Sequence, residues 1–238
     1  MGTRFPFRVV IVGTGTDVGK THVTACLLAA ARGRGIRALG YKPIATGVLD
    51  RCDDAEVHAA AAGASYVSPA FAYRRGVSAH LAAREEARPV DLVVIAQRAD
   101  ALAKDADIVV VETAGGLFSP LSDATTNVHL ALALSPALVV LVAADRLGVL
   151  HDVTACKLAA RASRVAISAV VLSTPRALDA SSGHNEGELD RLGWGPVVSV
   201  FPRANYDHPE SLEAGERLLD VLSESTVPDS HGVASTKP

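Results

Sequence analysis

GTGTDVGKT, residues 13–21, is the stretch that decides the fold. It follows an apolar run at residues 8–12 that predicts a strand, and it opens a helical pattern that continues to about Arg32. Glycines allow such a loop to turn its N–H groups around phosphate oxygens, and the start of the helix adds a positive end. Although Gly13 stands one residue further from Gly19-Lys20 than in the common form, the stretch predicts a P-loop that binds a magnesium–nucleoside triphosphate.

Two side chains of this loop carry the expected chemistry. Lys20 is predicted to reach the β- and γ-phosphates, and Thr21 to place its hydroxyl on Mg²⁺. The predicted nucleotide contacts from this part of the chain are Gly13, Thr14, Gly15, Thr16, Asp17, Val18, Gly19, Lys20, Thr21 and His22.

Apolar runs alternate with helical stretches along the rest of the chain. Strands are predicted at residues 8–12, 36–41, 107–112, 137–143, 166–172 and 197–201, and helices at 55–62, 90–103, 151–161 and 212–222. Strands without polar alternation are buried on both faces, and helices between them imply right-handed parallel crossovers. The predicted class is α/β, with a doubly wound, mainly parallel sheet of the P-loop NTPase type and helices on both faces.

Composition bounds the organisation and the partners. The 238 residues are 49% hydrophobic, which suits a single domain over residues 1–225, with a loop at 174–187 and a polar, disordered tail at 226–238. The net charge of −3 and the lack of a Lys/Arg cluster argue against nucleic-acid binding. No apolar segment reaches membrane length, and three widely spaced cysteines fit reduced thiols in a cytoplasmic protein.

Glu112 ends the most apolar of the predicted strands. Ligands of open α/β sheets bind beyond the carboxyl ends of the strands, so this carboxylate is predicted to hold Mg²⁺ directly or through water. Thr113, Ala114 and Gly115 follow and are expected to bring the backbone close to the nucleotide.

A second lysine, Lys42, follows the strand predicted at residues 36–41. That strand is expected to lie beside the P-loop strand, so that Lys42 points across the same sheet edge. Two lysines near one triphosphate suggest transfer chemistry, because one can hold phosphates while the other neutralises charge on the acceptor. Asp53 and Asp54 open the next predicted helix, either as a cap and first-turn acid or as a further Mg²⁺ ligand.

Taken together, these motifs resemble the dethiobiotin synthetase family. That family shows a loop of the form G-T-x-T-x-V-G-K-T, then Gly-Tyr-Lys-Pro before a small hydroxyl residue, Asp-Ala at a helix start, V-E-x-A-G-G, Pro-Leu-Ser-Asp and a later Leu-Gly. The matching stretches here are residues 13–21, 40–43 with Thr46, Asp54-Ala55, 111–116, 120–123 and Leu147-Gly148. The likeness keeps the order of the motifs and extends to about residue 172.

The resemblance implies a homodimeric, ATP-dependent ligase that closes the ureido ring of dethiobiotin from diaminopelargonic acid and CO₂. A carbamate and a phosphorylated carbamate would be its intermediates, and nucleoside diphosphate and phosphate its other products. Lys20 and Lys42 would be catalytic and hold phosphate and carbamate. The Mg²⁺ ligands would be Thr21, Asp54 and Glu112, and the substrate contacts would be Thr16, Lys42, Thr46, Leu147 and His151, with the turn from Leu147 to His151 reaching the partner subunit.

The half of the chain expected to bind the base departs from the family pattern. Many relatives carry an Asn after the fifth strand, where this chain has Ser173, and Arg203 and Asn205 stand where an acid is expected. Ser173, Pro202 and Arg203 are still predicted to contact the nucleotide. We therefore expect an enzyme that accepts several bases or prefers a nucleotide other than ATP.

Two smaller departures lie near the phosphates. Thr113 replaces a usual glycine, which is expected to add a side chain beside the metal site. Asp17 is one methylene shorter than the usual glutamate. Neither change removes a predicted catalytic group.

Other P-loop proteins fit the sequence less well. Partition and division-site ATPase switches carry an extra lysine early in the loop, where this chain has Gly15. Non-catalytic domains of the same fold usually lose the lysine or an acid, and here both are present. Amidating ligases of the cobyrinate type normally carry a glutaminase domain, for which the 238 residues leave no room.

Overall fold

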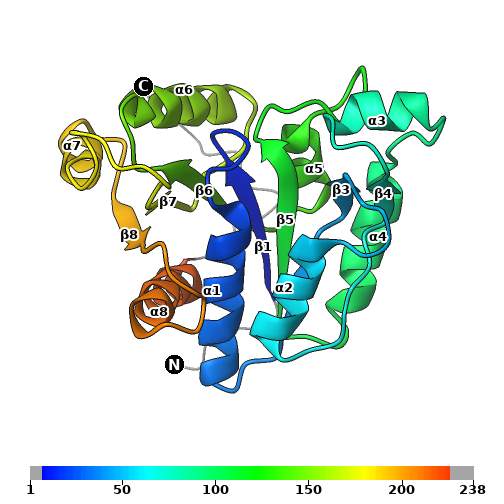
Figure 1. Cartoon of the computed structure of the whole chain (residues 1–238), viewed down its shortest axis with the longest axis horizontal. Helices are drawn as coiled ribbons and strands as arrows, with labels where there is room; N and C mark the ends of the chain where they lie inside the picture. Colours follow the sequence, from blue (N-terminus) through cyan, green and yellow to red (C-terminus); the bar gives the residue numbers. More distant parts are fainter. Residues whose placement is uncertain (1–6, 226–238) are drawn as a thin grey trace, which may run out of the picture.

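The computed structural model describes residues 7–225, and its centre is a six-stranded parallel sheet (Figure 1). The strands lie in the order β2-β5-β1-β6-β7-β8, and all neighbouring pairs are parallel. They are β1 (Phe7–Gly13), β2 (Ala38–Tyr41), β5 (Ile108–Gly116), β6 (Leu138–Ala144), β7 (Ala169–Ser173) and β8 (Val197–Phe201). The tail predicted at residues 226–238 lies outside the described residues.

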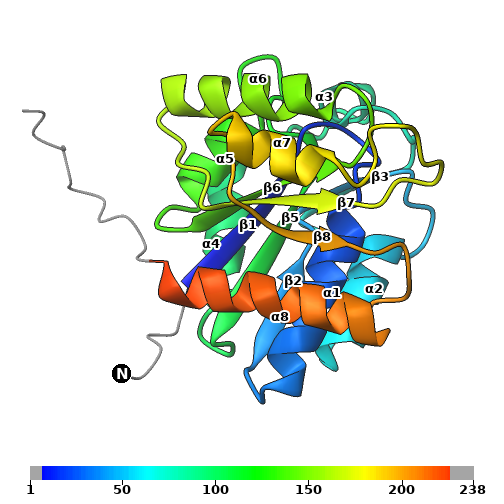
Figure 2. The same cartoon turned by 90° about the vertical axis from the view of Figure 1, so that its left-hand side faces the viewer.

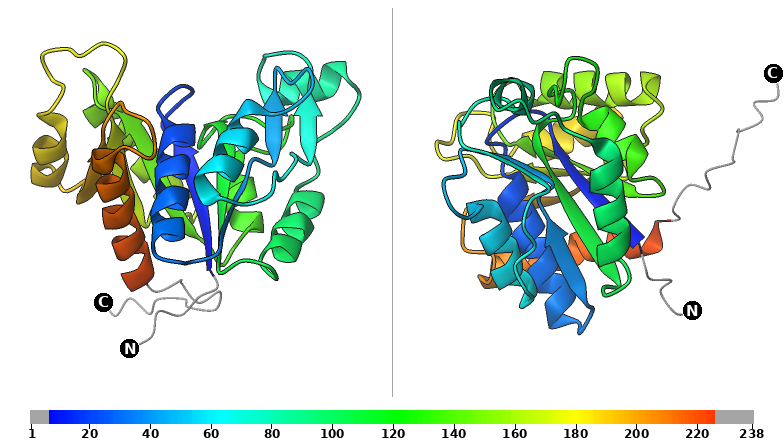
Figure 3. Two further views of the ribbon diagram at one scale, coloured as in Figure 1. Left: turned by 60° about the horizontal axis from the view of Figure 1, so that its bottom comes forward. Right: turned by 90° about the vertical axis from the view of Figure 1, so that its right-hand side faces the viewer.

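Helices cover both faces of this sheet (Figures 1 and 2). One face packs against α1 (Lys20–Gly33), α2 (Asp53–Ala62) and α8 (Pro209–Glu224). The other packs against α4 (Leu92–Leu102), α5 (Asn127–Ala133), α6 (Val149–Ala162) and α7 (Asn185–Arg191). Figure 3 shows a smaller parallel sheet of β3 (Ile44–Thr46) and β4 (Phe71–Tyr73) beside the main one, in contact with α3 (Ala79–Glu85).

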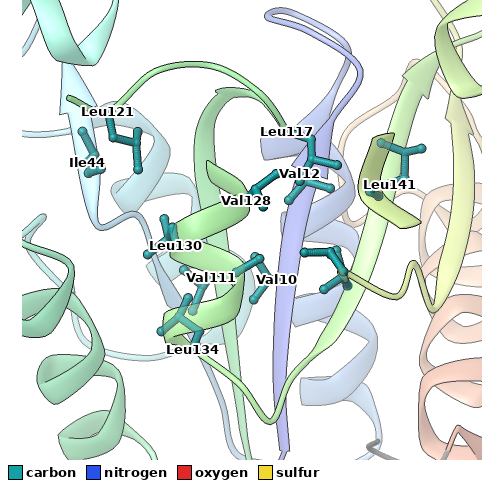
Figure 4. Close-up of a cluster of buried hydrophobic side chains, with 14 of the residues drawn as sticks. Val10, Val12, Ile44, Val111, Leu117, Leu121, Val128, Leu130, Leu134 and Leu141 are labelled. Atoms are coloured by element: carbon teal, nitrogen blue, oxygen red, sulfur yellow. The ribbon is translucent and has the colours of Figure 1, made fainter. Parts of the chain in front are cut away.

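Successive residues of the central strands point into opposite cores. In β1, Val10 and Val12 belong to the core beneath α4, α5 and α6, whereas Val9 and Ile11 belong to the core beneath α1 and α8. All four side chains are fully buried, which explains why the strand shows no polar alternation. Figure 4 shows Val10 and Val12 in one cluster with Val111 of β5. The predicted α/β class, with a parallel sheet between two layers of helices, is confirmed.

The predicted position of the second strand was wrong. β2 does not lie beside β1, because β5 lies between them and pairs with both. The strand predicted at residues 36–41 also begins later, at Ala38. Order along the chain does not fix order in a sheet, since a crossover helix can carry the next strand past a neighbour's place.

The strand predicted to end at Glu112 continues to Gly116, so Glu112 lies inside β5. After an irregularity in the register, Gly116 pairs with Gly13 of the P-loop strand. Ala114, Gly115 and Gly116 therefore belong to β5, and Gly116 brings its end beside the start of the P-loop.

Several short elements were missed: β3, β4, α3, α5 and α7. Each has seven residues or fewer, which is too short for a clear hydrophobic period. The loop predicted at 174–187 is shortened because α7 begins at Asn185. The predicted helices at 55–62, 90–103, 151–161 and 212–222 are present as α2, α4, α6 and α8 with shifted ends.

Two further observations concern residues 7–225 as a whole. No helix in this range combines the length and apolarity that crossing a membrane would require. Cys26, Cys52 and Cys156 are all free thiols, as predicted.

Candidate active site

A cavity of about 930 Å³ lies at the edge of the sheet where the strands end. Its walls come from the P-loop, residues 42–54, the end of β5 and the segments that follow β6, β7 and β8. This is the place where open α/β sheets bind ligands. The predicted site residues that line it are Thr16, Asp17, Val18, Gly19, Lys20, Thr21, His22, Lys42, Thr46, Asp54, Glu112, Ala114, Gly115, Ser173 and Arg203.

The P-loop has a backbone that only particular residues allow. Gly19 has φ +93°, and a Cβ there would lie 2.5 Å from Ser173 Oγ. Both the backbone conformation and the close approach of Ser173 therefore require glycine. Helix α1 begins at Lys20, which leaves its first N–H groups without partners inside the helix. The Lys20 ammonium folds back and donates to the Gly15 carbonyl at 2.9 Å. The loop is thus built as a cradle for an anion.

Beside the loop, Lys42, Asp54, Glu112 and Thr21 form one connected cluster. Lys42 Nζ lies 2.5 Å from Glu112 Oε1 and 2.8 Å from Asp54 Oδ2. Thr21 Oγ1 lies 2.9 Å from the same Glu112 oxygen and 3.0 Å from Asp54 Oδ1. Lys42 and Glu112 are both buried, so the ammonium and carboxylate are held where water cannot screen them.

Charge and burial set the protonation of this cluster. Burial would raise the pKa of Glu112, but Lys42 and His58 outweigh it and lower that pKa to about 2. Burial would lower the pKa of Lys42, but Glu112 and Asp54 raise it above its usual range. Burial, reinforced by the nearby Lys42, lowers the pKa of Lys20 to about 8. At neutral pH the cluster therefore holds charged lysine and an ionised glutamate.

The donor set of this cluster fits Mg²⁺. Thr21, Asp54 and Glu112 offer a hydroxyl and two carboxylates, the hard oxygen ligands that Mg²⁺ prefers. Within residues 7–225 there is no group of three or more His, Cys, Asp or Glu side chains suited to a metal ion. Thr21, Asp54 and Glu112 would supply only part of the octahedral shell of Mg²⁺, which leaves the other positions to water and substrate phosphates.

His58 belongs to the same cluster, although it was not among the residues predicted for the site. Its Nε2 lies 2.8 Å from Glu112 Oε2, and its side chain is fully buried. The signal was the spacing of four residues from Asp54 to His58 on a predicted helix, which places both on one face. Other cavity residues that were missed come from loops without a motif, among them Arg51, Arg146 and Arg176.

Several predicted residues do not line the cavity. The Thr14 N–H is taken by the Val142 carbonyl at 2.9 Å. Thr113 Oγ1 donates to the Ile11 carbonyl at 3.1 Å, so the prediction that it stands beside the metal site was wrong. Neighbours in a strand point to opposite faces, and Glu112 takes the face toward the cluster. Gly13, Gly15, Pro202, Leu147 and His151 also lie outside the lining.

The side of the cavity nearest β7 and β8 is built more loosely. Ser173 Oγ donates to the Val18 carbonyl at 2.6 Å, so this hydroxyl braces the P-loop. Arg176 and Arg203 line the cavity from exposed positions, and neither forms an ion pair with an acid among the described residues.

Comparison with known proteins finds relatives over most of the chain. A family model described as an AAA domain matches residues 8–210. The ATP-dependent dethiobiotin synthetase BioD of Caulobacter sp. (strain K31) is 34% identical over 238 residues, covering 93% of this chain and 96% of that protein. The protein of the same name from Nitrosospira multiformis is 34% identical over 216 residues, covering 89% and 93%.

Among solved structures, the cell division ATPase MinD of Pyrococcus furiosus matches with a TM-score of 0.57, covering 91% of this chain and 98% of that one. Its sequence identity to this chain is 16%, so the similarity concerns the fold alone.

Proposed function

The chain belongs to the dethiobiotin synthetase family, and we propose that its cavity closes the ureido ring of dethiobiotin from diaminopelargonic acid and CO₂ with ATP as co-substrate. The observation that carries this assignment is the second lysine. Lys42 is buried against Glu112 and Asp54 beside the P-loop, where a cation can face an acceptor as well as the transferring phosphate.

The reaction needs no nucleophile from the protein. One amine of diaminopelargonic acid takes up CO₂ and loses a proton, which gives a carbamate. A carbamate oxygen attacks the γ-phosphorus of ATP, and the bond to the bridging oxygen breaks so that ADP leaves. The second amine then attacks the carbamate carbon and loses a proton, and inorganic phosphate leaves as the ring closes.

The chain's residues would act through position and charge. Lys20 holds the β- and γ-phosphates, and Lys42 neutralises charge on the carbamate and the transferring group. Thr21, Asp54 and Glu112 would hold Mg²⁺, which offsets the negative charge of the triphosphate when bound. Thr16 and Thr46 line the same cavity and would contact the substrate.

We also propose a homodimer with the substrate site near the interface. Leu147 is 75% exposed, and His151 at the start of α6 is exposed as well. Both lie outside this chain's cavity, so their predicted substrate contacts require a partner subunit. Light scattering should give about twice the chain mass of 24.6 kDa. A measured mass equal to that of one chain would contradict the dimer.

The activity is tested by following the carbon of CO₂. The protein is incubated with ATP, Mg²⁺, diaminopelargonic acid and ¹³C-bicarbonate, and the products are measured by mass spectrometry and by ADP release. We expect dethiobiotin with one labelled carbon and one ADP per ring. ATP hydrolysis that is independent of diaminopelargonic acid, with no labelled product, would instead favour a P-loop switch or another function of this fold.

A further inference from the structure

We propose that His58 is a positioning residue for Glu112 and fixes the carboxylate in the orientation that serves the metal site. The inference rests on the proposed role of Glu112 as a Mg²⁺ ligand. His58 belongs to none of the motifs that indicate the family, and its role follows from its place in the structure.

The two oxygens of Glu112 have separate partners. Oε1 faces Thr21 Oγ1 at 2.9 Å and Lys42 Nζ at 2.5 Å, whereas Oε2 faces His58 Nε2 at 2.8 Å. His58 and Glu112 are buried, with side-chain exposures of 0% and 1%. Rotating the carboxylate away from Thr21 would break the contact with His58 in a place that water cannot reach, so the histidine holds that orientation.

Helix α2 gives His58 a second effect. Asp54 and His58 are four residues apart, so they lie on one face of the helix. Asp54 contacts Thr21 and Lys42, and His58 contacts Glu112 on β5. The contact between His58 and Glu112 therefore fixes α2 against β5 and sets the distance between the two acids proposed to hold Mg²⁺.

The fold makes room for an imidazole at this point. A Cβ on Gly40 would lie 2.5 Å from His58 Cβ and 2.8 Å from Leu28 Cδ1, so the ring packs against bare backbone of β2. Its second nitrogen, Nδ1, is buried and has no hydrogen-bond partner among the described residues. Burying Nδ1 without a partner costs free energy of desolvation, which an apolar side chain in the same space would avoid. The hydrogen bond between Nε2 and Glu112 is therefore what a histidine adds at this position.

Chemistry fixes the direction of this hydrogen bond. An ionised carboxylate can only accept, so His58 Nε2 carries the proton and donates it to Oε2. A glutamine at this position can also donate an amide proton from the end of its side chain, whereas a leucine cannot donate at all. The two substitutions therefore separate the hydrogen bond from simple filling of space.

The test measures how activity and nucleotide binding depend on Mg²⁺ in His58→Leu and His58→Gln. We expect His58→Leu to raise the Mg²⁺ concentration for half-maximal turnover about tenfold or more, as losses of partners to metal ligands do. Turnover at saturating Mg²⁺ should recover to within about threefold of wild type. The affinity for a fluorescent ADP analogue should show the same shift in Mg²⁺ dependence, and His58→Gln should stay close to wild type.

Two further variants make the result decisive. Leu28→Ala removes a buried side chain from the same neighbourhood without touching Glu112, so it should lower stability but leave the Mg²⁺ dependence unchanged. Glu112→Gln tests the proposed role of Glu112 as a Mg²⁺ ligand, because it must shift the Mg²⁺ dependence if Glu112 holds the ion.

The outcomes separate the two hypotheses. If Glu112→Gln shifts the Mg²⁺ dependence and His58→Leu does not, the role of His58 is overturned and the proposed function stands. If neither variant shifts it, Glu112 is not a ligand and the role of His58 fails with it, while the formation of labelled dethiobiotin still tests the proposed function separately. Should His58→Leu not fold, His58→Asn, whose amide falls short of Glu112, is compared with His58→Gln instead, and equal Mg²⁺ dependence in these two would overturn the proposal.

Discussion

Two sides of the cavity are built in different ways: the side of the P-loop and Lys42, proposed to hold the phosphates (the phosphate end), and the side that follows β7 and β8, proposed to hold the base (the base end). At the phosphate end, the Glu112 carboxylate contacts both Lys42 and His58, and all three side chains are buried. At the base end, Arg176 and Arg203 are exposed on segments that follow β7 and β8. Buried charges must be paired, which allows them one arrangement, whereas exposed side chains can adopt several.

This contrast separates what the enzyme does from which nucleotide it uses. The phosphate end holds the groups proposed for phosphoryl transfer, and its buried charges would be costly to rearrange. At the base end the Ser173 hydroxyl donates to the Val18 carbonyl, so it is engaged in holding the P-loop instead of a base. We therefore expect loss of either lysine at the phosphate end, Lys20 or Lys42, to impair catalysis strongly, and changes at the base end to alter affinity modestly.

The largest effect is expected for Lys20→Ala. Lys20 is the P-loop cation, so its removal takes charge away from the phosphates in both the bound and the transferring state. We predict a loss of about 10³-fold in kcat/KM for ATP, the size typical of a lost stabilising donor. Steady-state kinetics and nucleotide binding should both report it. A variant that binds ATP as well as wild type would contradict the comparison, because the phosphate end would then tolerate a missing charge.

The next largest effect is expected when the pH is raised, which should lower kcat/KM for ATP. Lys20 has a pKa lowered to about 8, mainly by burial, so the free enzyme loses this charge as the pH rises above about 8. A triphosphate favours the charged form, so binding must restore the proton. We predict that kcat/KM for ATP falls by about tenfold per pH unit above pH 8, while kcat changes less. Lys20→Arg stays charged and should flatten this fall; an unchanged slope would assign the pH dependence to another group.

Exchange of the base should matter much less. Arg176 and Arg203 line the base end from exposed positions. A site selects one base strongly only when the wrong base leaves buried polar groups of the site unpaired. We predict values of kcat/KM for ATP, CTP and GTP that lie within about tenfold of one another. A preference for ATP above about 100-fold would show that the base end is as well specified as the phosphate end.

The smallest effect is expected for Arg203→Ala. Arg203 is exposed and lines the cavity, where solvent screens its charge. We predict a rise in KM for ATP of about two- to fivefold with kcat unchanged. Arg217→Ala, which removes an exposed arginine that does not line the cavity, is the matched control. A large fall in kcat for Arg203→Ala would give the base end a part in the chemistry.

Sequence alone predicted the fold class and most of the phosphate end. The P-loop, Lys42, Asp54 and Glu112 stand in motifs whose spacing follows from the strand–loop–helix geometry, and the structure brings them to one cavity. Hydrophobic runs predicted the long strands because these are buried on both faces.

Features that depend on tertiary packing were not predictable. The place of β5 between β1 and β2 is set by how the sheet assembles, not by the order of strands along the chain. The proposed role of His58 depends on a contact across 54 residues of sequence. The spacing from Asp54 to His58 indicates a shared helix face, but it does not indicate that Glu112 lies opposite that face. The strand predicted at residues 107–112 ends before Thr113, whereas β5 continues to Gly116. The sequence therefore could not show that the Thr113 side chain points away from the cluster, toward the Ile11 carbonyl.

The central claim is that Lys42 acts in transfer and not in holding the nucleotide. Its most direct test is dethiobiotin formation by Lys42→Ala, measured beside the affinity of the same variant for ATP, with Lys42→Met to control for the lost side-chain volume. We predict that turnover falls about 10²- to 10³-fold in both variants while ATP affinity stays within about threefold. Unchanged turnover, or losses of turnover and affinity in equal measure, would contradict the account.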